Sequence, residues 1–254
     1  MKIQCEARSD VGRKRKGNED SLFLNPDQRL YVVADGMGGH AAGEVASRVA
    51  VDAINEFVTI TGGNEEITWP FGLDDSISYE GNRLKTAIRQ ANRKVLEAVR
   101  ESAEYEGMAT TVAAVLVDGD VANLAHVGDS RIYLWSGGRI LQLTSDHSWV
   151  NEQIQSGVIS PEQARSHPLR NVVTRALGGR ADLLVDVQAR QMVAGDVLLL
   201  CSDGLTTMIA DDDIARILGE AEGDIARAAT ALVAEANERG GEDNITVVLL
   251  KFED

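Results

Sequence analysis

Cysteines, long apolar runs and basic residues are all scarce in this chain, and each shortage excludes a class of protein. Two cysteines, Cys5 and Cys201, in 254 residues cannot form a disulfide framework, so we expect a reducing cytoplasm. The longest apolar run, Val112–Val117, covers six residues, whereas a membrane-spanning helix needs about 20. We therefore expect a cytoplasmic protein without a membrane partner.

The balance of charge is strongly acidic. Lys and Arg number 25 against 40 Asp and Glu, which gives a net charge of −15. Surfaces that bind nucleic acid or anionic lipid are basic, so the balance argues against both partners. Hydrophobic residues make up 44% and charged residues 26% of the chain, as in ordinary globular proteins. A chain of this length fits one domain, 1–254, with a sizeable core, and we expect a monomer.

Hydrophobic periodicity predicts an α+β fold. Apolar residues recur at helical spacing over 41–60, 82–103, 211–218 and 224–239. Strands are predicted over 3–7, 21–24, 29–34, 110–117, 121–127, 131–135, 139–143, 183–189, 196–201 and 244–252. Asp118-Gly119-Asp120 and Ser136-Gly137-Gly138 indicate tight hairpins. Consecutive hairpins favour antiparallel pairing, so we predict two antiparallel β-sheets packed as a sandwich and flanked on both sides by helices.

Acidic residues recur at the ends of these apolar strands. The positions are Glu19 and Asp20, Asp35, Asp129, Asp203 and Asp243. If the strand ends converge, several carboxylates share a small space and need a compensating cation. Ligands that are all oxygen select hard cations such as Mg²⁺ or Mn²⁺. The five segments together therefore predict a metal site.

Other interpretations compete with this one. Asp-Gly is a common turn, and Asp118-Gly119 is explained by its hairpin alone. The Gly36-x-Gly38-x-x-Ala41 pattern after a strand fits a dinucleotide-binding module, although the preceding Asp35 would repel a pyrophosphate and the hairpins disagree with a parallel sheet. No pair of the four histidines has the spacing of a zinc site.

Seven strings, in order, resemble the protein phosphatase 2C family of metal-dependent Ser/Thr phosphatases in its compact bacterial form. They are SDVGRKRKGNEDS (9–21), VADGMGGHAAGE (33–44), ATTVAAVLV (109–117), AHVGDSRIYL (125–134), HPLRNVVTRALG (167–178), LLLCSDGL (198–205) and GEDNITVVLL (241–250). The family fold is a two-sheet sandwich flanked by helices, as the periodicity also predicts. The resemblance further implies that 145–175 is a flap subdomain beside the site.

The resemblance implies a role for each acidic position. Asp35 is expected to bridge two metal ions, and the Gly36 carbonyl to bind one of them. Asp203 and Asp243 are expected to hold the other ion. Glu19 and Asp20 would bind directly or through water, and Asp129 would join Asp203 at a third, weaker ion. The cofactors implied are therefore two or three Mn²⁺ or Mg²⁺ ions.

Two basic or titratable residues complete the expected site. Arg15, five residues before Asp20, matches the phosphate-binding arginine of the family. Some family members have His directly after the Asp-Gly, where this chain has Met37, and its nearest histidine is His40. His40 and a water on the metal are therefore rival candidates for the general acid.

The function expected is hydrolysis of phosphoserine and phosphothreonine in proteins by a metal-activated water. The partners are phosphorylated proteins, made by a Ser/Thr kinase and including the kinase itself. A second enzyme reading is a specialised phosphatase for one anti-sigma-type regulator. Two alternatives from other classes are a phosphoprotein-binding pseudophosphatase and the dinucleotide-binding module. The complete acidic set argues against the pseudophosphatase, since a degenerate site would have lost some of its ligands.

Overall fold

The computed structural model describes residues 1–39, 42–63 and 69–254. The strands are β1 (Lys2–Asp10), β2 (Asp20–Asn25), β3 (Leu30–Met37), β4 (Ala109–Thr110), β5 (Val112–Asp118), β6 (Val121–Val127), β7 (Arg131–Ser136), β8 (Arg139–Gln142), β9 (Asp186–Gln191), β10 (Val197–Cys201) and β11 (Ile245–Glu253). The α-helices are α1 (Ala42–Thr61), α2 (Tyr79–Glu101), α3 (Trp149–Gln155), α4 (Pro161–Arg165), α5 (Asp203–Thr206), α6 (Asp211–Glu220) and α7 (Ile225–Glu238).

The strands form two sheets in which every pairing of the described residues is antiparallel. One sheet has the order β1-β11-β10-β7-β8, and the other β2-β3-β5-β6-β9 with β4 added to β3. The predicted hairpins close β5–β6 and β7–β8, and Gly119, Gly137 and Gly138 adopt the positive φ angles that such tight turns require. The antiparallel sheets confirm the predicted fold class and give no support to a doubly wound dinucleotide-binding fold.

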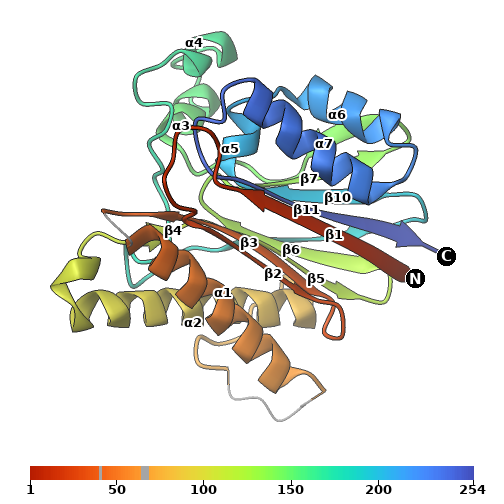
Figure 1. Ribbon diagram of the computed structural model, residues 1–254. Coiled ribbons are helices and arrows are strands. Elements are labelled where there is room, and N and C mark those ends of the chain that lie inside the picture. Colours follow the sequence, from red (N-terminus) through yellow and green to blue (C-terminus); the bar gives the residue numbers. More distant parts are fainter. Residues whose placement is uncertain (40–41, 64–68) are drawn as a thin grey trace.

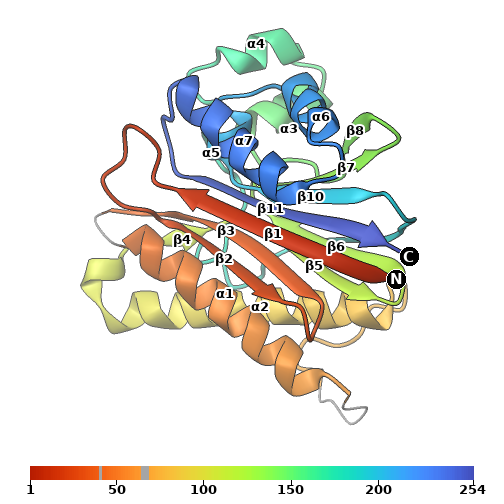
Figure 2. The ribbon, with the colours of Figure 1, turned by 45° about the vertical axis from the view of Figure 1, so that its right-hand side comes forward.

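The central strands are apolar throughout because they are buried on both faces. Along β11, Val247 and Leu249 pack toward α6 and α7, whereas Val248 and Leu250 pack between the two sheets. Side chains alternate between the faces of a strand, so one strand serves two layers of the core. The result is four layers, helices over each outer face of a two-sheet sandwich (Figure 1, Figure 2).

Helices α1 and α2 pack on the sheet that contains β2 and β3, and they bury the apolar residues that the sequence places at helical spacing. Ala46, Ala50 and Ile54 of α1 are fully buried, as are Leu84 and Ile88 of α2. Helix α2 begins at residue 79, three residues before the predicted start, because the Ser78 side chain accepts a hydrogen bond from the Gly81 N–H at 2.9 Å. Residues 79–81, which precede the predicted helix, are therefore helical.

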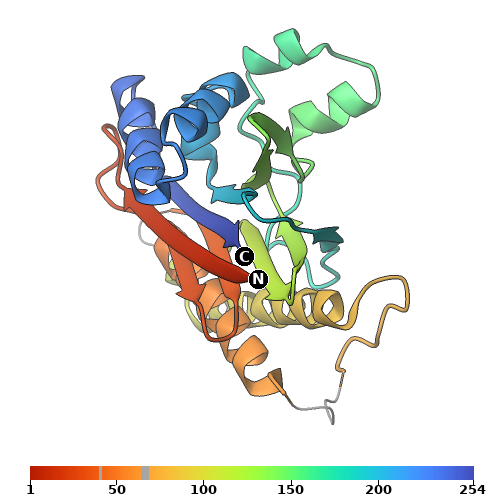
Figure 3. The ribbon, with the colours of Figure 1, turned by 90° about the vertical axis from the view of Figure 1, so that its right-hand side faces the viewer.

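Two further differences from the prediction bear on the site. Helix α5 was not predicted; it begins directly after β10, at Asp203. Strand β9 covers 186–191 rather than 183–189. The segment 145–175 holds only the short helices α3 and α4, which lie outside the sandwich (Figure 3). No helix in the described parts of the chain combines the length and apolar character needed to cross a bilayer.

Candidate metal centre

The strand ends that carry the acidic residues meet at one end of the sandwich, opposite the two chain termini (Figure 1). Asp20 at the start of β2 lies directly across from Asp35 at the end of β3. Residues facing each other in this way have Cβ atoms about 5 Å apart. Ser202, between β10 and α5, reaches across from the other sheet and donates a hydrogen bond to Asp20 Oδ2 at 2.7 Å. Both sheets therefore contribute to the site.

The glycines after Asp35 and Asp203 allow the chain to pack closely there. A Cβ atom on Gly36 would lie 2.0 Å from the Gly43 carbonyl oxygen, and one on Gly204 would lie 2.0 Å from the Asn244 carbonyl oxygen. Any side chain at either position would displace backbone. The Asp-Gly pairs at these strand ends are thus packing requirements as well as sources of a carboxylate, whereas a Cβ on Gly119 would meet nothing within 4 Å.

Asn244 fastens the segments that carry Glu19 and Asp243. Its Oδ1 accepts a hydrogen bond from the Glu19 N–H at 2.8 Å, and its Nδ2 donates to the carbonyls of Val11 at 2.8 Å and Gly17 at 2.9 Å. One buried side chain thereby ties both ends of the loop between β1 and β2 to the start of β11. The sequence interpretation assigned no role to Asn244, although it lies inside the GEDN string.

The carboxyl groups have strongly perturbed pKa values in the metal-free protein. Burial raises the pKa of Asp20 to about 7, that of Asp129 to about 7 and that of Asp203 to about 6. Burial also raises the pKa of Asp35 well above its usual range, and the charges of Asp20, Asp203, Asp129 and Asp243 raise it further. Each of these shifts arises because the charged form is poorly solvated and lies near other acids.

The donor set fits hard divalent cations. Asp20 Oδ1 is buried without a hydrogen-bond partner among the described residues, which leaves a charged oxygen available for a ligand. Burial raises the pKa of both Asp35 and Asp203, and the charge of Asp203 raises the pKa of Asp35 further, so a cation bound near both carboxylates would relieve their repulsion. Oxygen ligands with this surplus of negative charge suit Mg²⁺ and Mn²⁺.

Arg15 lies at the edge of the acidic cluster. Its Nη2 donates to Asp243 Oδ2 at 2.7 Å, and its Nη1 is 3.8 Å from Glu19 Oε2. The hydrogen bond to Asp243 raises the pKa of the guanidinium, so Arg15 is charged at every relevant pH. Its side chain is 47% exposed, and a guanidinium has five N–H donors. Donors therefore remain for an anion that approaches from solvent.

Asp129 follows β6 in a loop that the segment 145–175 holds in place. Arg131 forms a bidentate ion pair with Asp146, with contacts of 2.9, 3.0 and 2.7 Å. The His147 N–H donates to the Gly128 carbonyl at 2.9 Å, and the Gly128 N–H donates to His147 Nδ1 at 3.0 Å. The base of this segment is thus fixed to the residues on either side of Asp129. Sequence reasoning did not identify Arg131, Asp146 or His147.

His126, His147 and Asp186 form a second cluster of metal-ligand types among the described residues. The two imidazole rings stack at 4.6 Å with an angle of 14° between planes. Imidazole binds a metal in the plane of its ring, so parallel rings cannot both direct a nitrogen at one ion. Arg175 occupies the same space, 3.0 Å from His147 Nε2 and 2.8 Å from Asp186 Oδ1. This cluster is better explained as a cross-link between the segment 145–175 and β9.

His40 falls outside the described residues, as does Ala41 of the dinucleotide pattern. The structure consequently neither supports nor opposes a role for His40 in proton transfer.

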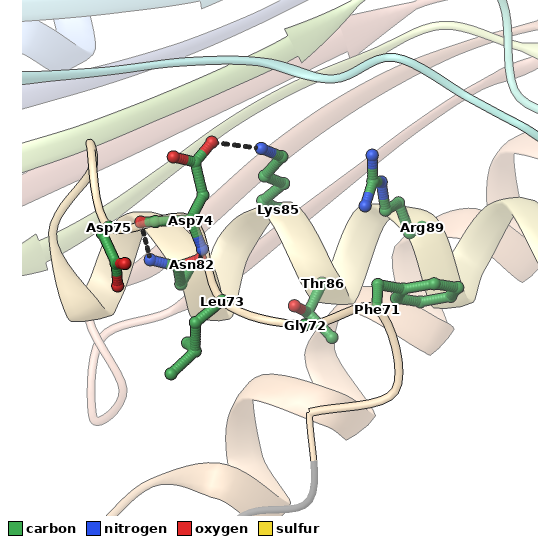
Figure 4. A pocket seen from close by; sticks show the side chains of 9 residues that line it. All are labelled: Phe71, Gly72, Leu73, Asp74, Asp75, Asn82, Lys85, Thr86 and Arg89. Carbon is green, nitrogen blue, oxygen red and sulfur yellow. Dashed lines mark hydrogen bonds and ion pairs between the residues drawn. The ribbon is translucent and has the colours of Figure 1, made fainter.

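A hollow of about 350 Å³ lies away from the acidic cluster, beside α2 (Figure 4). Two of its lining residues bind Asp74: Lys85 Nζ is 2.7 Å from Asp74 Oδ2, and Asn82 Nδ2 donates to the Asp74 carbonyl at 2.9 Å. The Arg89 guanidinium lies 5.6 Å from the centroid of the Phe71 ring. These contacts fasten the loop before α2 onto the helix.

Comparison with known proteins decides which family carries this arrangement. The family model for protein phosphatase 2C matches residues 13–243. The chain belongs to the protein phosphatase 2C family. It is 38% identical to the serine/threonine phosphatase stp of Listeria monocytogenes over 256 aligned residues, which cover 98% of this chain and 96% of that protein.

Solved structures agree with this membership. The Mycobacterium tuberculosis serine/threonine phosphatase PstP/Ppp superposes with a TM-score of 0.86 at 37% identity, over 99% of both chains. The catalytic domain of the serine/threonine protein phosphatase PstP in complex with two manganese ions gives a TM-score of 0.84 at 36% identity, again over 99% of both chains. These matches confirm the resemblance, the two-sheet fold and the interpretation as a protein-serine/threonine phosphatase that depends on Mn²⁺ or Mg²⁺.

Proposed function

We propose that the protein hydrolyses phosphoserine and phosphothreonine in other proteins at the acidic centre, and that the acidic residues named above hold its cations. The single observation that carries the proposal is the convergence of five acidic segments, from both sheets, around the buried Asp20 Oδ1, which has no hydrogen-bond partner in the part of the chain that the structure describes. A phosphoprotein-binding pseudophosphatase would not need to keep a cluster of buried acids whose desolvation and mutual repulsion destabilise the fold.

Each acidic residue is assigned a place around the cations. Asp35 would be shared by two cations; the Gly36 carbonyl would join it at one of them, and Asp203 and Asp243 at the other. The position of Asp35 opposite Asp20, and the effect of the charges of Asp20, Asp203, Asp129 and Asp243 on its pKa, support this central position.

Three further acids complete the arrangement. Glu19 and Asp20 lie beside the pair and bind directly or through water. Asp129 shares a third, weaker ion with Asp203, in line with the effect of Asp203 on the pKa of Asp129.

Titration of the metal-free protein with Mn²⁺ is expected to count two tight sites, and Asp129→Asn is expected to remove only a weaker one.

The chemistry divides between the cations and the chain. When bound, divalent ions supply an activated water and neutralise charge on the phosphoryl oxygens. The chain holds these ions at one rigid edge and excludes water from the buried side of the carboxylates. Arg15 presents a planar fork to two phosphoryl oxygens, and Asp243 orients that fork. No covalent bond between enzyme and phosphate is required.

Arg15→Ala is expected to weaken binding of inorganic phosphate and to raise KM about tenfold or more, because a charge-assisted bidentate contact is lost. The measurements are steady-state kinetics on a phosphothreonine peptide and product inhibition by phosphate. Arg13→Ala is the matched control, since Arg13 is exposed in the same loop. Equal effects of the two substitutions would contradict a specific role for Arg15.

His40→Ala tests the remaining proton-transfer role. If His40 is the general acid, the variant is expected to lose about tenfold to a hundredfold in kcat and to lose the alkaline limb of its pH profile, because no imidazolium remains to be deprotonated there. The kcat of both proteins is measured from pH 6 to pH 9.5. An unchanged rate and profile would assign the proton to water at the metal centre.

The proposal also covers the compartment, the oligomeric state and the partner of the enzyme. We place it in the cytoplasm as a monomeric single catalytic domain, 1–254, with 145–175 as the flap beside the site and a Ser/Thr kinase supplying or constituting its substrate. Cys5 and Cys201 are both free thiols, which agrees with a reducing compartment. Analytical ultracentrifugation of the metal-loaded protein tests the monomer.

A further inference from the structure

The loop between β1 and β2 carries two lysines that no described contact explains. Lys14 and Lys16 lie on either side of Arg15 and are exposed. Neither side chain has a hydrogen bond or ion pair to any described residue, whereas Arg15 between them is engaged by Asp243 and Glu19. In a chain with 15 more acids than bases, these two ammonium groups, unpaired among the described residues, therefore stand beside an arginine that contacts the acidic cluster.

The backbone that carries these lysines is held firmly. The N–H groups of Arg13 and Lys14 both donate to the Gly241 carbonyl, at 2.7 and 3.2 Å. Asn244 fastens the loop on both sides of the lysines, at Val11 and at Gly17. Gly12 adopts a φ of +84°, and a Cβ there would lie 2.2 Å from the Asp243 carbonyl oxygen. The loop therefore keeps its place against the residues of the metal centre.

The positions of Lys14 and Lys16 determine which part of a bound substrate their side chains can contact. Neighbouring Cα atoms are about 3.8 Å apart, so both lysines start within that distance of the residue that contacts Asp243. If Arg15 holds the phosphate, as proposed, the side chains on either side of it are long enough to bring their charges within a Debye length, about 8–10 Å, of a substrate residue next to the phosphorylated one.

We propose that Lys14 and Lys16 select phosphoprotein segments in which acidic residues flank the phosphorylated serine or threonine. The proposal rests on the proposed function of the acidic centre. The surrounding field is otherwise negative and would repel such segments. Two ammonium groups at the edge of the site would attract acidic residues of the substrate locally. Because the loop between β1 and β2 is already fixed, less conformational entropy is lost when these groups bind a substrate.

The test compares two phosphothreonine peptides of equal length, one with Asp and Glu around the phosphothreonine and one with Ala and Gln. The quantity measured is the ratio of their kcat/KM values at low ionic strength with saturating Mn²⁺. Exposed ion pairs each change affinity between about 1.4-fold and fivefold. Lys14→Ala/Lys16→Ala is therefore expected to lower the ratio about fivefold, through KM for the acidic peptide, and 0.5 M salt is expected to remove most of the difference.

Arg100→Ala/Arg139→Ala is the matched control, since both arginines are exposed and belong to α2 and β8 rather than to the loop; it should keep the wild-type ratio. A ratio that stays within a factor of 1.5 in Lys14→Ala/Lys16→Ala, or that falls equally in the control, would overturn the proposal. Failure of the proposed function would look different. In that case the wild-type protein would show no Mn²⁺-dependent hydrolysis of either peptide.

Discussion

Asp203→Asn is expected to lower phosphatase activity by at least 100-fold. Asp203 is assigned to two cation sites, and its charge acts on Asp35. An amide in its place removes a charge from the centre and can point an N–H toward a cation. Electrostatic stabilisation of the transferred phosphoryl group is the main contribution to catalysis of this kind. The measurement is kcat/KM on a phosphothreonine peptide at saturating Mn²⁺.

Controls must show that the loss of activity in Asp203→Asn does not arise from misfolding or from the removal of any one negative charge. In chelator, Asp203→Asn is expected to melt no lower than the wild type, because one of several mutually repelling acids is gone. Asp118→Asn removes the same charge from an exposed hairpin turn and should retain full activity. Retention of more than a few per cent of activity by Asp203→Asn would show that this residue does not hold the cations.

Millimolar Mn²⁺ is expected to raise the melting temperature of the protein by about 5–10 °C. A ligand at 100 times its dissociation constant adds about 2.7 kcal/mol to the free energy of unfolding, and each kcal/mol corresponds to about 2–4 °C for a chain of this size. Differential scanning fluorimetry after removal of metal provides the measurement. Asp203→Asn should show a much smaller rise, and NAD should produce none.

The rise in melting temperature that Mn²⁺ produces is expected to grow with pH. Folded-state pKa values of about 7 for Asp20 and Asp129 and about 6 for Asp203 lie above the value of about 3.9 in the unfolded chain. Protonation of these groups therefore favours folding fully below about pH 4, and this contribution is lost as the pH rises through 6 to 7. The metal-free protein should become less stable over that range, and Mn²⁺ should cancel the loss.

Screening of the acidic surface is the alternative explanation for such a shift. A net charge of −15 could be screened by any cation, so Ca²⁺ and monovalent salt at equal ionic strength serve as controls. Screening would act equally on the wild type and on Asp203→Asn. Equal shifts in the two proteins would mean that the acids do not form the proposed site.

The sequence predicted most of the fold because the strands obey simple rules of burial. Runs such as Val197–Cys201 are apolar throughout since both faces are covered, and the turns at Asp118 and Ser136 contain glycines at the positions where φ is positive. Helix α5 escaped prediction because four residues are too few for a helical period. The early start of α2 depends on a cap at Ser78, whose signal is one residue in a polar loop.

The acidic positions could be predicted because each one bounds a strand, but the residues that support them could not. Asn244 and His147 act through contacts with residues far along the chain, at Val11, Gly17 and Gly128. No local periodicity encodes such contacts. The stacking of His126 on His147 likewise depends on the meeting of β6 with the segment that follows β8.

Phosphate release from a phosphothreonine peptide, with Mn²⁺ and with excess chelator, tests the central claim most directly. The protein is first stripped of metal, and its metal content is verified. The account predicts turnover with Mn²⁺, loss of at least 99% of that turnover in chelator, and full recovery when Mn²⁺ is restored. Robust turnover by verified metal-free protein, or no turnover with Mn²⁺, would contradict it.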